Sequence, residues 1–127
     1  MKLLLDTHVF LWIVSGDRRL TPRYRALFED PDNQVFLSVA SCWEIVIKAG
    51  LDRLRLPLPA TDYVMKQIEA NQVTLLGIRH SHLKALETLP ALHKDPFDRM
   101  ILAQALAESM SLLSKDKALR AYKVRVL

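Results

Sequence analysis

The sequence predicts an α/β fold with a mainly parallel central sheet and helices on both faces, and three observations support this. Short apolar runs, typical of strands buried on both faces, alternate with segments of helical length. The 127 residues suffice for one domain with a single core. Half of them are hydrophobic and a quarter are charged, which excludes disordered and low-complexity architectures. No stretch resembles a linker, so we expect residues 1–127 to form one domain.

The sequence of the first third of the chain predicts one strand followed by two helices, which begins the alternation of strands and helices. An all-leucine run that stops at Asp6 is expected to be a fully buried strand. The next segment has helical length and ends at Gly16. A second helix is entered through Thr21 and Pro22, a good cap followed by proline at the first helical position. The expected ranges are 3–5 for the strand and 8–15 and 23–29 for the helices.

The rest of the chain continues this alternation. Pro57 and Pro59 make the segment around them extended or turning, because proline restricts the residue before it. Further strands are expected at residues 35–39, 73–78, 112–113 and 124–127. Further helices are expected at 41–51, from Thr61 or Asp62 to 70, at 81–88 and at 95–110, of which the last is the longest and clearest.

Charge and cysteine content bear on the partners and the compartment. The chain has 18 basic and 14 acidic side chains, a net charge of +4, which permits nucleic-acid binding but is equally explained by solubility. The lone cysteine, Cys42, excludes an intrachain disulfide and fits a reducing compartment. The longest apolar run, residues 9–14, is far shorter than the ~20 residues that span a bilayer, and no signal-peptide pattern is found. We therefore expect a cytoplasmic protein without membrane association.

Four acidic side chains lie where an α/β fold gathers functional groups. Asp6 and Asp116 follow predicted strands, and open α/β sheets bind ligands at the carboxyl ends of their strands. Glu44 lies on the single polar line of an otherwise apolar helix, so this line is expected to face a cleft. Asp98 lies at the edge of the apolar stripe of the longest helix.

Each of these acids also has a purely structural explanation. An aspartate after a strand is often the N-cap of the next helix. Glu44 can pair with Lys48 one turn later, a contact worth ~0.3–0.5 kcal/mol. In the longest helix Asp95 is a suitable N-cap, so capping explains this residue completely. Capping explains Asp98 less well, although an acid is favoured in the first turn by the helix dipole.

If the four acids converge, they form a metal site that acts on phosphate esters. Four carboxylates within a few ångströms cannot all ionise without a counter-charge. Mg²⁺ and Mn²⁺ prefer carboxylate and water oxygens, activate a water and steady the leaving oxygen of an in-line displacement. A zinc centre is not expected, because the histidines have no ligand-like spacing with Cys42. A surface or core role is favoured for each histidine, although His93 is near enough to Asp95 to touch the site.

Four motifs, taken together, resemble those of a known family. LLLDTH at residues 3–8 ends a strand on an acid, SVASCWEI at 38–45 carries Glu44, and LPALHKDPFDRMILAQA at 89–105 carries Asp98. LLSKD at 112–116 has a hydroxyl residue shortly before its acid, with serine where threonine is common. In this order the motifs resemble those of a PIN domain, specifically of the VapC-type toxin ribonucleases of bacterial toxin–antitoxin pairs. The resemblance covers essentially the whole chain, and residues 89–105 are its most specific part.

The resemblance implies a PIN-like three-layer sandwich and an endoribonuclease that depends on Mg²⁺ or Mn²⁺. It assigns catalysis and metal binding to the four motif acids, Asp6, Glu44, Asp98 and Asp116. Three neighbouring residues are secondary candidates for the site: Thr7, Asp95 and Ser114. It further implies a homodimer that a small antitoxin protein of the VapB type holds inactive.

Basic and apolar side chains near the motifs are candidate contacts for these partners. Four cations neighbour a motif acid or lie one helical turn from it, and are expected to hold the RNA backbone: Lys48, Arg99, Lys115 and Lys117. A solvated cation that balances the acids explains each of them equally well. An apolar region around Trp12, Trp43 and residues 54–59 is expected to be exposed and to receive an antitoxin helix, unless both tryptophans are core residues.

Two other classes of protein are alternatives. A receiver-like phosphoacceptor signalling domain shares the length, the α/β fold and an acidic magnesium pocket. It requires paired acids after the first strand, whereas Asp6 is followed by Thr7 and His8. A non-catalytic interaction module would have kept the fold and lost the chemistry, and the presence of all four acids argues against it.

Overall fold

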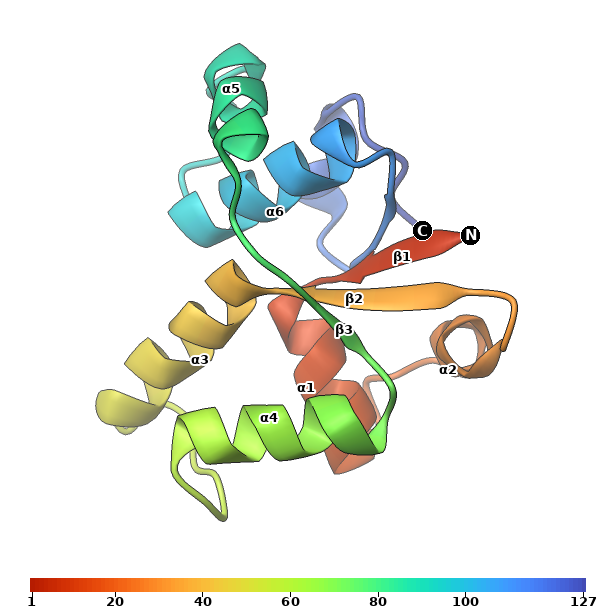
Figure 1. Cartoon of the computed structure of the whole chain (residues 1–127), viewed down its shortest axis with the longest axis vertical. Coiled ribbons are helices and arrows are strands. Elements are labelled where there is room, and N and C mark those ends of the chain that lie inside the picture. The colour runs from red at the N-terminus through yellow and green to blue at the C-terminus, as the bar shows by residue number, and fades with distance from the viewer.

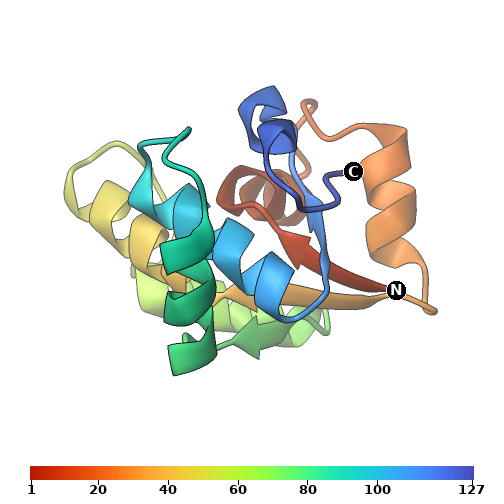
Figure 2. The same ribbon diagram turned by 90° about the horizontal axis from the view of Figure 1, so that it is seen from above.

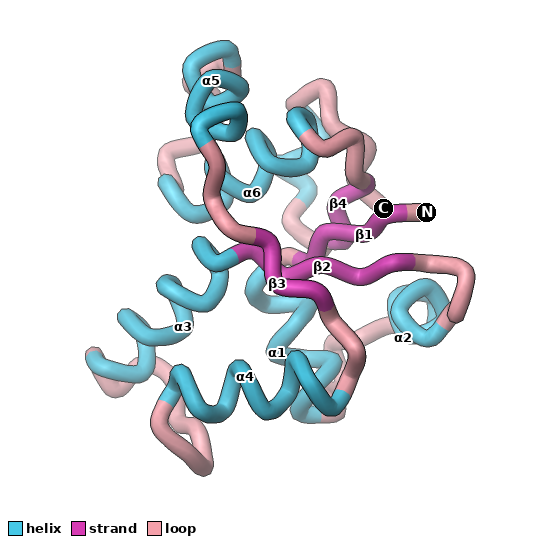
Figure 3. The backbone as a smooth tube through the Cα atoms, in the orientation of Figure 1, coloured by secondary structure: helices cyan, strands magenta, loops and turns pink.

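A computed structural model describes all 127 residues, and four parallel strands form its central layer (Figure 1). The strands lie in the order β3-β2-β1-β4 and form one contiguous band (Figure 3). Their bounds are β1 (Lys2–Leu5), β2 (Gln34–Ser38), β3 (Thr74–Leu76) and β4 (Ser111–Leu113). The helices are α1 (Thr7–Ser15), α2 (Pro22–Glu29), α3 (Val39–Gly50), α4 (Ala60–Ala70), α5 (His80–Thr88), α6 (Pro96–Ala107) and the 3₁₀ helix η1 (Lys117–Ala121).

Helices cover both faces of the sheet, as the views from the front and from above show (Figures 1 and 2). Successive side chains of a strand point to opposite faces, so the leucines of β1 enter two separate cores. Leu3 and Leu5 pack with residues of α1, α2, α3 and α4. Leu4 packs with residues of α6 and η1, and α5 lies outside α6. The predicted α/β sandwich of three layers is confirmed.

The register of the strands aligns their carboxyl ends. Leu5 is paired with Leu37 of β2 on one side and with Leu113 of β4 on the other. The residues that follow, Asp6 and Ser114 among them, therefore leave the sheet at the same edge. The Tyr24 hydroxyl lies 2.7 Å from the backbone oxygen of Ser114 and 2.6 Å from that of Leu127, and its single proton is shared between these two acceptors, which fixes the chain after β4.

Local sequence signals account for most helix starts and for the end of α1. Thr21 Oγ1 accepts from the Tyr24 N–H and Pro22 is the first residue of α2, as predicted. Gly16 ends α1 with φ of +67°, a conformation that side chains with a Cβ rarely adopt. None of the helices is long and apolar enough to cross a membrane.

Several predicted boundaries are wrong, each for a local reason. Helix α3 begins at Val39 rather than at 41, because Ser38 Oγ accepts from the Ala40 N–H and caps it. Helix α6 ends at Ala107 rather than at 110, where the chain turns through Ser109 with φ of +54°. Strand β3 is shorter than the predicted 73–78.

The C-terminal region also differs from the prediction. Residues 124–127 make only one isolated bridge, between Val126 and Leu112, instead of a full strand. The unpredicted η1 begins after Asp116, whose carboxylate accepts from the Ala118 N–H. This cap turns the chain away from the sheet directly after β4.

Candidate active site

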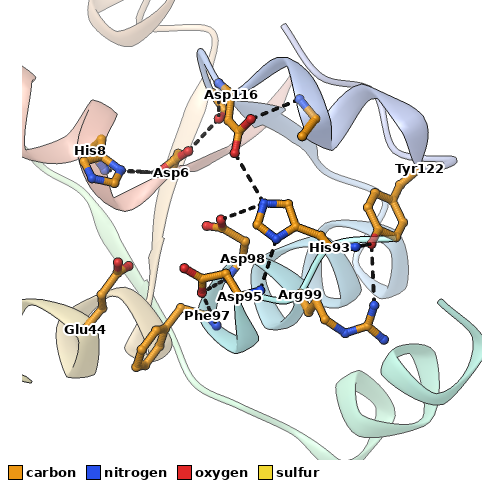
Figure 4. Close-up of polar contacts among 12 residues, drawn as sticks. Asp6, His8, Glu44, His93, Asp95, Phe97, Asp98, Arg99, Asp116 and Tyr122 are labelled. Carbon is orange, nitrogen blue, oxygen red and sulfur yellow. Dashed lines mark hydrogen bonds and ion pairs between the residues drawn. The ribbon is translucent and has the colours of Figure 1, made fainter. Parts of the chain in front are cut away.

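The four predicted acids face a common space at the carboxyl edge of the sheet (Figure 4). Asp6 follows β1 and Asp116 follows β4, Glu44 lies on α3, and Asp98 lies in the first turn of α6. The side chains come from four separate elements, and the two strands that deliver Asp6 and Asp116 are hydrogen-bonded neighbours. Convergence is therefore a consequence of the parallel sheet and of the way α3 and α6 pack beside each other.

Asp6 is both a helix cap and a member of the acid cluster. Its Oδ1 accepts from the His8 N–H at 3.0 Å, which caps α1, and its Oδ2 accepts from Ser114 Oγ at 2.5 Å. Burial raises the pKa of Asp6, but hydrogen bonds from His8 and Ser114 outweigh it and leave the pKa below its ordinary value. The residue is only 5% exposed, so this is a buried, ionised carboxylate.

Glu44 has one satisfied oxygen and one unsatisfied oxygen. Lys48 Nζ lies 2.8 Å from Oε2, the i,i+4 pair that the sequence permits. Oε1 is buried and has no hydrogen-bond partner. A buried polar atom without a partner is costly, and a bound cation would remove this cost. The pairing with Lys48 therefore explains Glu44 only in part, because the lysine occupies only one of its two oxygens.

Asp98 faces the cluster because Asp95 performs the capping. Asp95 Oδ1 accepts from the N–H groups of Phe97 at 2.8 Å and of Asp98 at 3.2 Å. Burial, and then the negative charges of Asp6, Asp95 and Glu44, raise the pKa of Asp98 to about 7, and His93 partly opposes the rise. Asp98 is therefore a largely buried carboxyl beside other acidic groups, and both features favour its protonated form.

Asp116 and His93 complete the cluster. Asp116 Oδ1 caps η1, while its Oδ2 lies 3.4 Å from Nε2 of His93. The same nitrogen lies 3.3 Å from Oδ2 of Asp98 (Figure 4). The sequence predicts only that His93 lies close enough to Asp95 to touch the site. The position of His93 two residues before the helix cap is the one signal in the sequence for this contact.

The secondary candidates differ in what they contact. Ser114 Oγ donates to Asp6 and accepts from the Asp116 N–H at 3.1 Å, so it links two acids directly. Thr7 Oγ1 instead donates to Ser41 Oγ at 2.9 Å and contacts no acid in this way. This buried bond joins α1 to α3 and so fixes the elements that carry Asp6 and Glu44.

The predicted RNA-binding cations also separate into groups. Lys48 lies at the acids through Glu44, and Lys115 lies at the rim, where Nζ donates to the Arg19 carbonyl at 3.2 Å. Lys117 is exposed at the start of η1. The Arg99 guanidinium, however, donates to the Pro90 carbonyl at 2.9 Å and lies beside the Tyr122 hydroxyl, directed away from the acids (Figure 4).

The predicted apolar region is divided between two surfaces. Trp12 lines an open groove with Leu54, Leu56 and Lys48. Trp43 is 60% exposed and packs edge-on against Phe97, with ring centroids 5.2 Å apart. At about 100° per residue, Trp43 and Lys48 point in different directions from α3, and Trp43 does not line the groove of Trp12. That this region receives an antitoxin helix stays a prediction.

The donor set fits a hard divalent cation. It consists of carboxylate oxygens, with the unpaired Oε1 of Glu44 among them. Carboxylate oxygens of Asp98 and Asp116 lie within 4.8 Å of each other and of a ring nitrogen of His93. Carboxylates gathered in this way can hold a cation and orient a water toward a phosphate ester.

Comparisons with known proteins identify related sequences and related folds. Ribonuclease VapC22 of Mycobacterium tuberculosis is 29% identical over 121 residues, which are 94% of this chain and 91% of the relative. The crystal structure of VapBC2 from Rickettsia felis bound to a promoter DNA fragment has a TM-score of 0.76 at 12% identity, covering 100% of this chain and 98% of that chain. A toxin–antitoxin complex from Klebsiella pneumoniae has a TM-score of 0.65 at 17% identity, covering 98% and 95%. These two structures share the fold.

The family profile of the PIN domain matches residues 3–124, nearly the full length of the chain and a range that includes the four acids. This match excludes the receiver-domain alternative. The chain belongs to the PIN-domain family.

Proposed function

We propose that this protein is an Mg²⁺- or Mn²⁺-dependent endoribonuclease toxin that hydrolyses RNA phosphodiester bonds and is neutralised by a cognate antitoxin. One observation carries the proposal: Asp6, Glu44, Asp98 and Asp116 face one space with too few cations to balance them (Figure 4). The VapC ribonuclease relative supports RNA as the substrate. An activity on cellular RNA implies that the protein acts in the cytoplasm.

The four acids would hold the divalent cation, and Glu44 would contribute its unpaired Oε1. The cation supplies an activated water and charge stabilisation at the phosphate. Ser114 keeps Asp6 oriented through its hydroxyl, and the low pKa of Asp6 keeps that ligand anionic. Asp95 acts on the site as the cap that orients the first turn of α6, which carries Asp98.

The RNA backbone would follow the basic side of the acids. Lys48 and Lys115 lie at this side, and Arg53 and Arg55 line the adjoining groove. Trp12 lies in the same groove beneath Arg19, whose guanidinium carbon is 5.1 Å from the ring centroid. An aromatic ring among cations suits single-stranded RNA, because bases stack on aromatic side chains while cations contact phosphates. Arg99 is assigned a structural role, since its contacts are Pro90 and Tyr122.

Two protein partners complete the proposal. An antitoxin segment could place an arginine on the carboxylates, or an acid on the cationic rim, and so block the site. A second copy of this chain would cover the apolar surface between α3, α4 and β3, where an apolar pocket is lined by Val39, Val46, Met65 and Leu75. Contiguous exposed apolar side chains of this kind are typical of protein interfaces.

The test of activity maps cleavage ends on a total RNA pool with Mg²⁺, with EDTA, and with the variant Asp6→Asn. We expect cleavage in Mg²⁺ only, and none with the variant. Cleavage that persists in EDTA would contradict the metal dependence. No cleavage by the wild type under any of these conditions would favour the non-catalytic interaction module.

The test of the partners uses co-expression with the neighbouring reading frame and light scattering. We expect a stable complex that copurifies and suppresses cleavage, and a dimer mass for the isolated chain that Met65→Asp reduces to a monomer. Absence of a complex would remove the antitoxin from the proposal. A monomeric wild type would remove the homodimer.

A further inference from the structure

His93 lies among the acids of the site and has contacts on both ring nitrogens and on its backbone. It belongs to the loop between α5 and α6, and its side chain is 18% exposed. Its Nδ1 accepts from the Asp95 N–H at 3.1 Å, while Nε2 points at Asp98 and Asp116 (Figure 4). In this position the imidazole can either bind the cation or donate a hydrogen bond to the carboxylates.

The contact with Asp95 determines which nitrogen carries the proton. A backbone N–H can only donate, so Nδ1 must offer its lone pair and the ring proton lies on Nε2. A metal bond through Nε2 would move that proton to Nδ1, where it would face the Asp95 N–H. Nε2 is therefore a hydrogen-bond donor toward the acids and offers no free lone pair to a metal in this arrangement.

The single Nε2–H serves two carboxylates that would otherwise repel each other. It makes a hydrogen bond of 3.4 Å to Oδ2 of Asp116 and lies 3.3 Å from Oδ2 of Asp98. These acids come from α6 and from the segment after β4, and His93 contacts both. A donor between two anionic oxygens reduces their repulsion and limits their separation.

Hydrogen bonds of both the backbone and the ring fix the position of His93. The His93 N–H donates to the hydroxyl of Tyr122 at 2.8 Å, and Tyr122 is itself buried. Arg99 donates to the Pro90 carbonyl at the start of the same loop and lies 3.5 Å from the Tyr122 hydroxyl. With Asp95 fixed as the cap of α6, the loop is anchored on both sides of His93.

We infer that His93 is a positioning residue that sets the geometry of Asp98 and Asp116 for the cation through its Nε2–H. The inference rests on the proposed function, since it requires a divalent cation at these acids. Partners that orient metal ligands in this way typically change metal affinity 10–100-fold when they are removed. A ligand role would change affinity as well, so the test must distinguish a donor from a ligand.

The experiment measures Mn²⁺ binding by electron paramagnetic resonance without RNA, in the wild type and three variants of His93. His93→Leu removes the donor, and His93→Asn offers an amide only at the Nδ1 position. His93→Gln carries its amide N–H near the position of Nε2. We expect Mn²⁺ binding to weaken about 10–100-fold in the first two and to be largely restored in His93→Gln. His80→Leu, which alters an exposed histidine on α5, is the matched control and is expected to bind as the wild type does.

A second measurement reads the nitrogen directly. In protein with ¹⁵N-labelled histidine, we expect the pulsed spectrum of bound Mn²⁺ to show no directly coordinated imidazole nitrogen. A directly coordinated nitrogen, or His93→Leu binding Mn²⁺ as tightly as the wild type, would overturn the inference while leaving the proposed function intact. A wild type that binds no Mn²⁺ would overturn the proposed function and this inference with it. Thermal unfolding in EDTA identifies any variant that fails to fold, in which case His93→Asn and His93→Gln decide the outcome.

Discussion

Replacing Asp98 with asparagine should stabilise the cation-free protein at neutral to basic pH. The pKa of Asp98 is raised from 3.8 to about 7. Folding therefore favours the protonated carboxyl, so the ionised form destabilises the fold. The penalty is absent below about pH 4, develops as the pH rises from 4 to 7, and is complete above 7. A rise of about 3 pKa units at ~1.4 kcal/mol per unit corresponds to about 4 kcal/mol.

Asparagine cannot ionise, so Asp98→Asn is free of this penalty. It loses the favourable interaction of an acid with the helix dipole, ~0.3–1 kcal/mol, and we expect a net gain of about 3 kcal/mol at pH 8 in EDTA. At pH 4 the gain should vanish. Added Mg²⁺ should stabilise the wild type, by neutralising the cluster, much more than the variant. RNA cleavage by the variant should be abolished.

The assay is urea unfolding at pH 4 and pH 8, with EDTA and with Mg²⁺. Asp62 is the matched control, because it occupies the third position of α4 as Asp98 does of α6, but is exposed. Asp62→Asn should lose ~0.3–1 kcal/mol, with no gain at pH 8. If Asp98→Asn in EDTA is no more stable than the wild type at pH 8, the reasoning that uncompensated charge burdens this site is refuted.

Three further substitutions test the neighbours of the acids. Asp95→Asn should leave the unfolding free energy in urea nearly unchanged, because asparagine caps a helix as well as aspartate, whereas Asp95→Ala should cost ~0.5–2 kcal/mol. Loss of RNA cleavage in Asp95→Asn with unchanged stability would instead make Asp95 a fifth acid of the site. Ser114→Ala should lower the unfolding free energy by about 1–3 kcal/mol and reduce RNA cleavage, because it leaves Asp6 Oδ2 and the Asp116 N–H without their partner. Ser114→Thr keeps the hydroxyl and should be less affected, and equal activity of the two variants would argue against this role. Lys48→Met should lower the unfolding free energy by about 1–3 kcal/mol in EDTA and by less in Mg²⁺, because the divalent cation replaces the ammonium group beside Glu44. An equal loss of stability in both buffers would contradict this prediction.

The acids of this site show that capping and chemistry are compatible. Asp6 and Asp116 each use one oxygen to cap the helix that follows and direct the other into the cluster. A carboxylate has enough acceptor positions for both. The cap fixes the side chain, so the remaining oxygen is held in place before any ligand binds.

The sequence by itself determined the layers and the location of the site. Short uninterrupted apolar runs such as Leu3–Leu5, stopped by a polar residue, are typical of a strand buried on both faces, and parallel strands align the residues that follow them. The acids after β1 and β4 could therefore be assigned to one edge without any knowledge of packing. Boundaries were less well predicted where a single hydrogen bond decided them, as at Ser38 and Asp116.

Only the tertiary structure decided which side chains contact the acids. Arg99 lies next to Asp98 in sequence but is bound by Pro90 and Tyr122, and Trp43 lies next to Glu44 but packs on Phe97. Neighbours along a helix point about 100° apart, so proximity in sequence does not determine what a side chain faces. His93 shows the converse, because its position between Asp98 and Asp116 depends on a loop held by Tyr122, a residue far along the chain. Periodicity and caps are local and can be read from the sequence, whereas the pairing of separate elements is set by how the whole core packs.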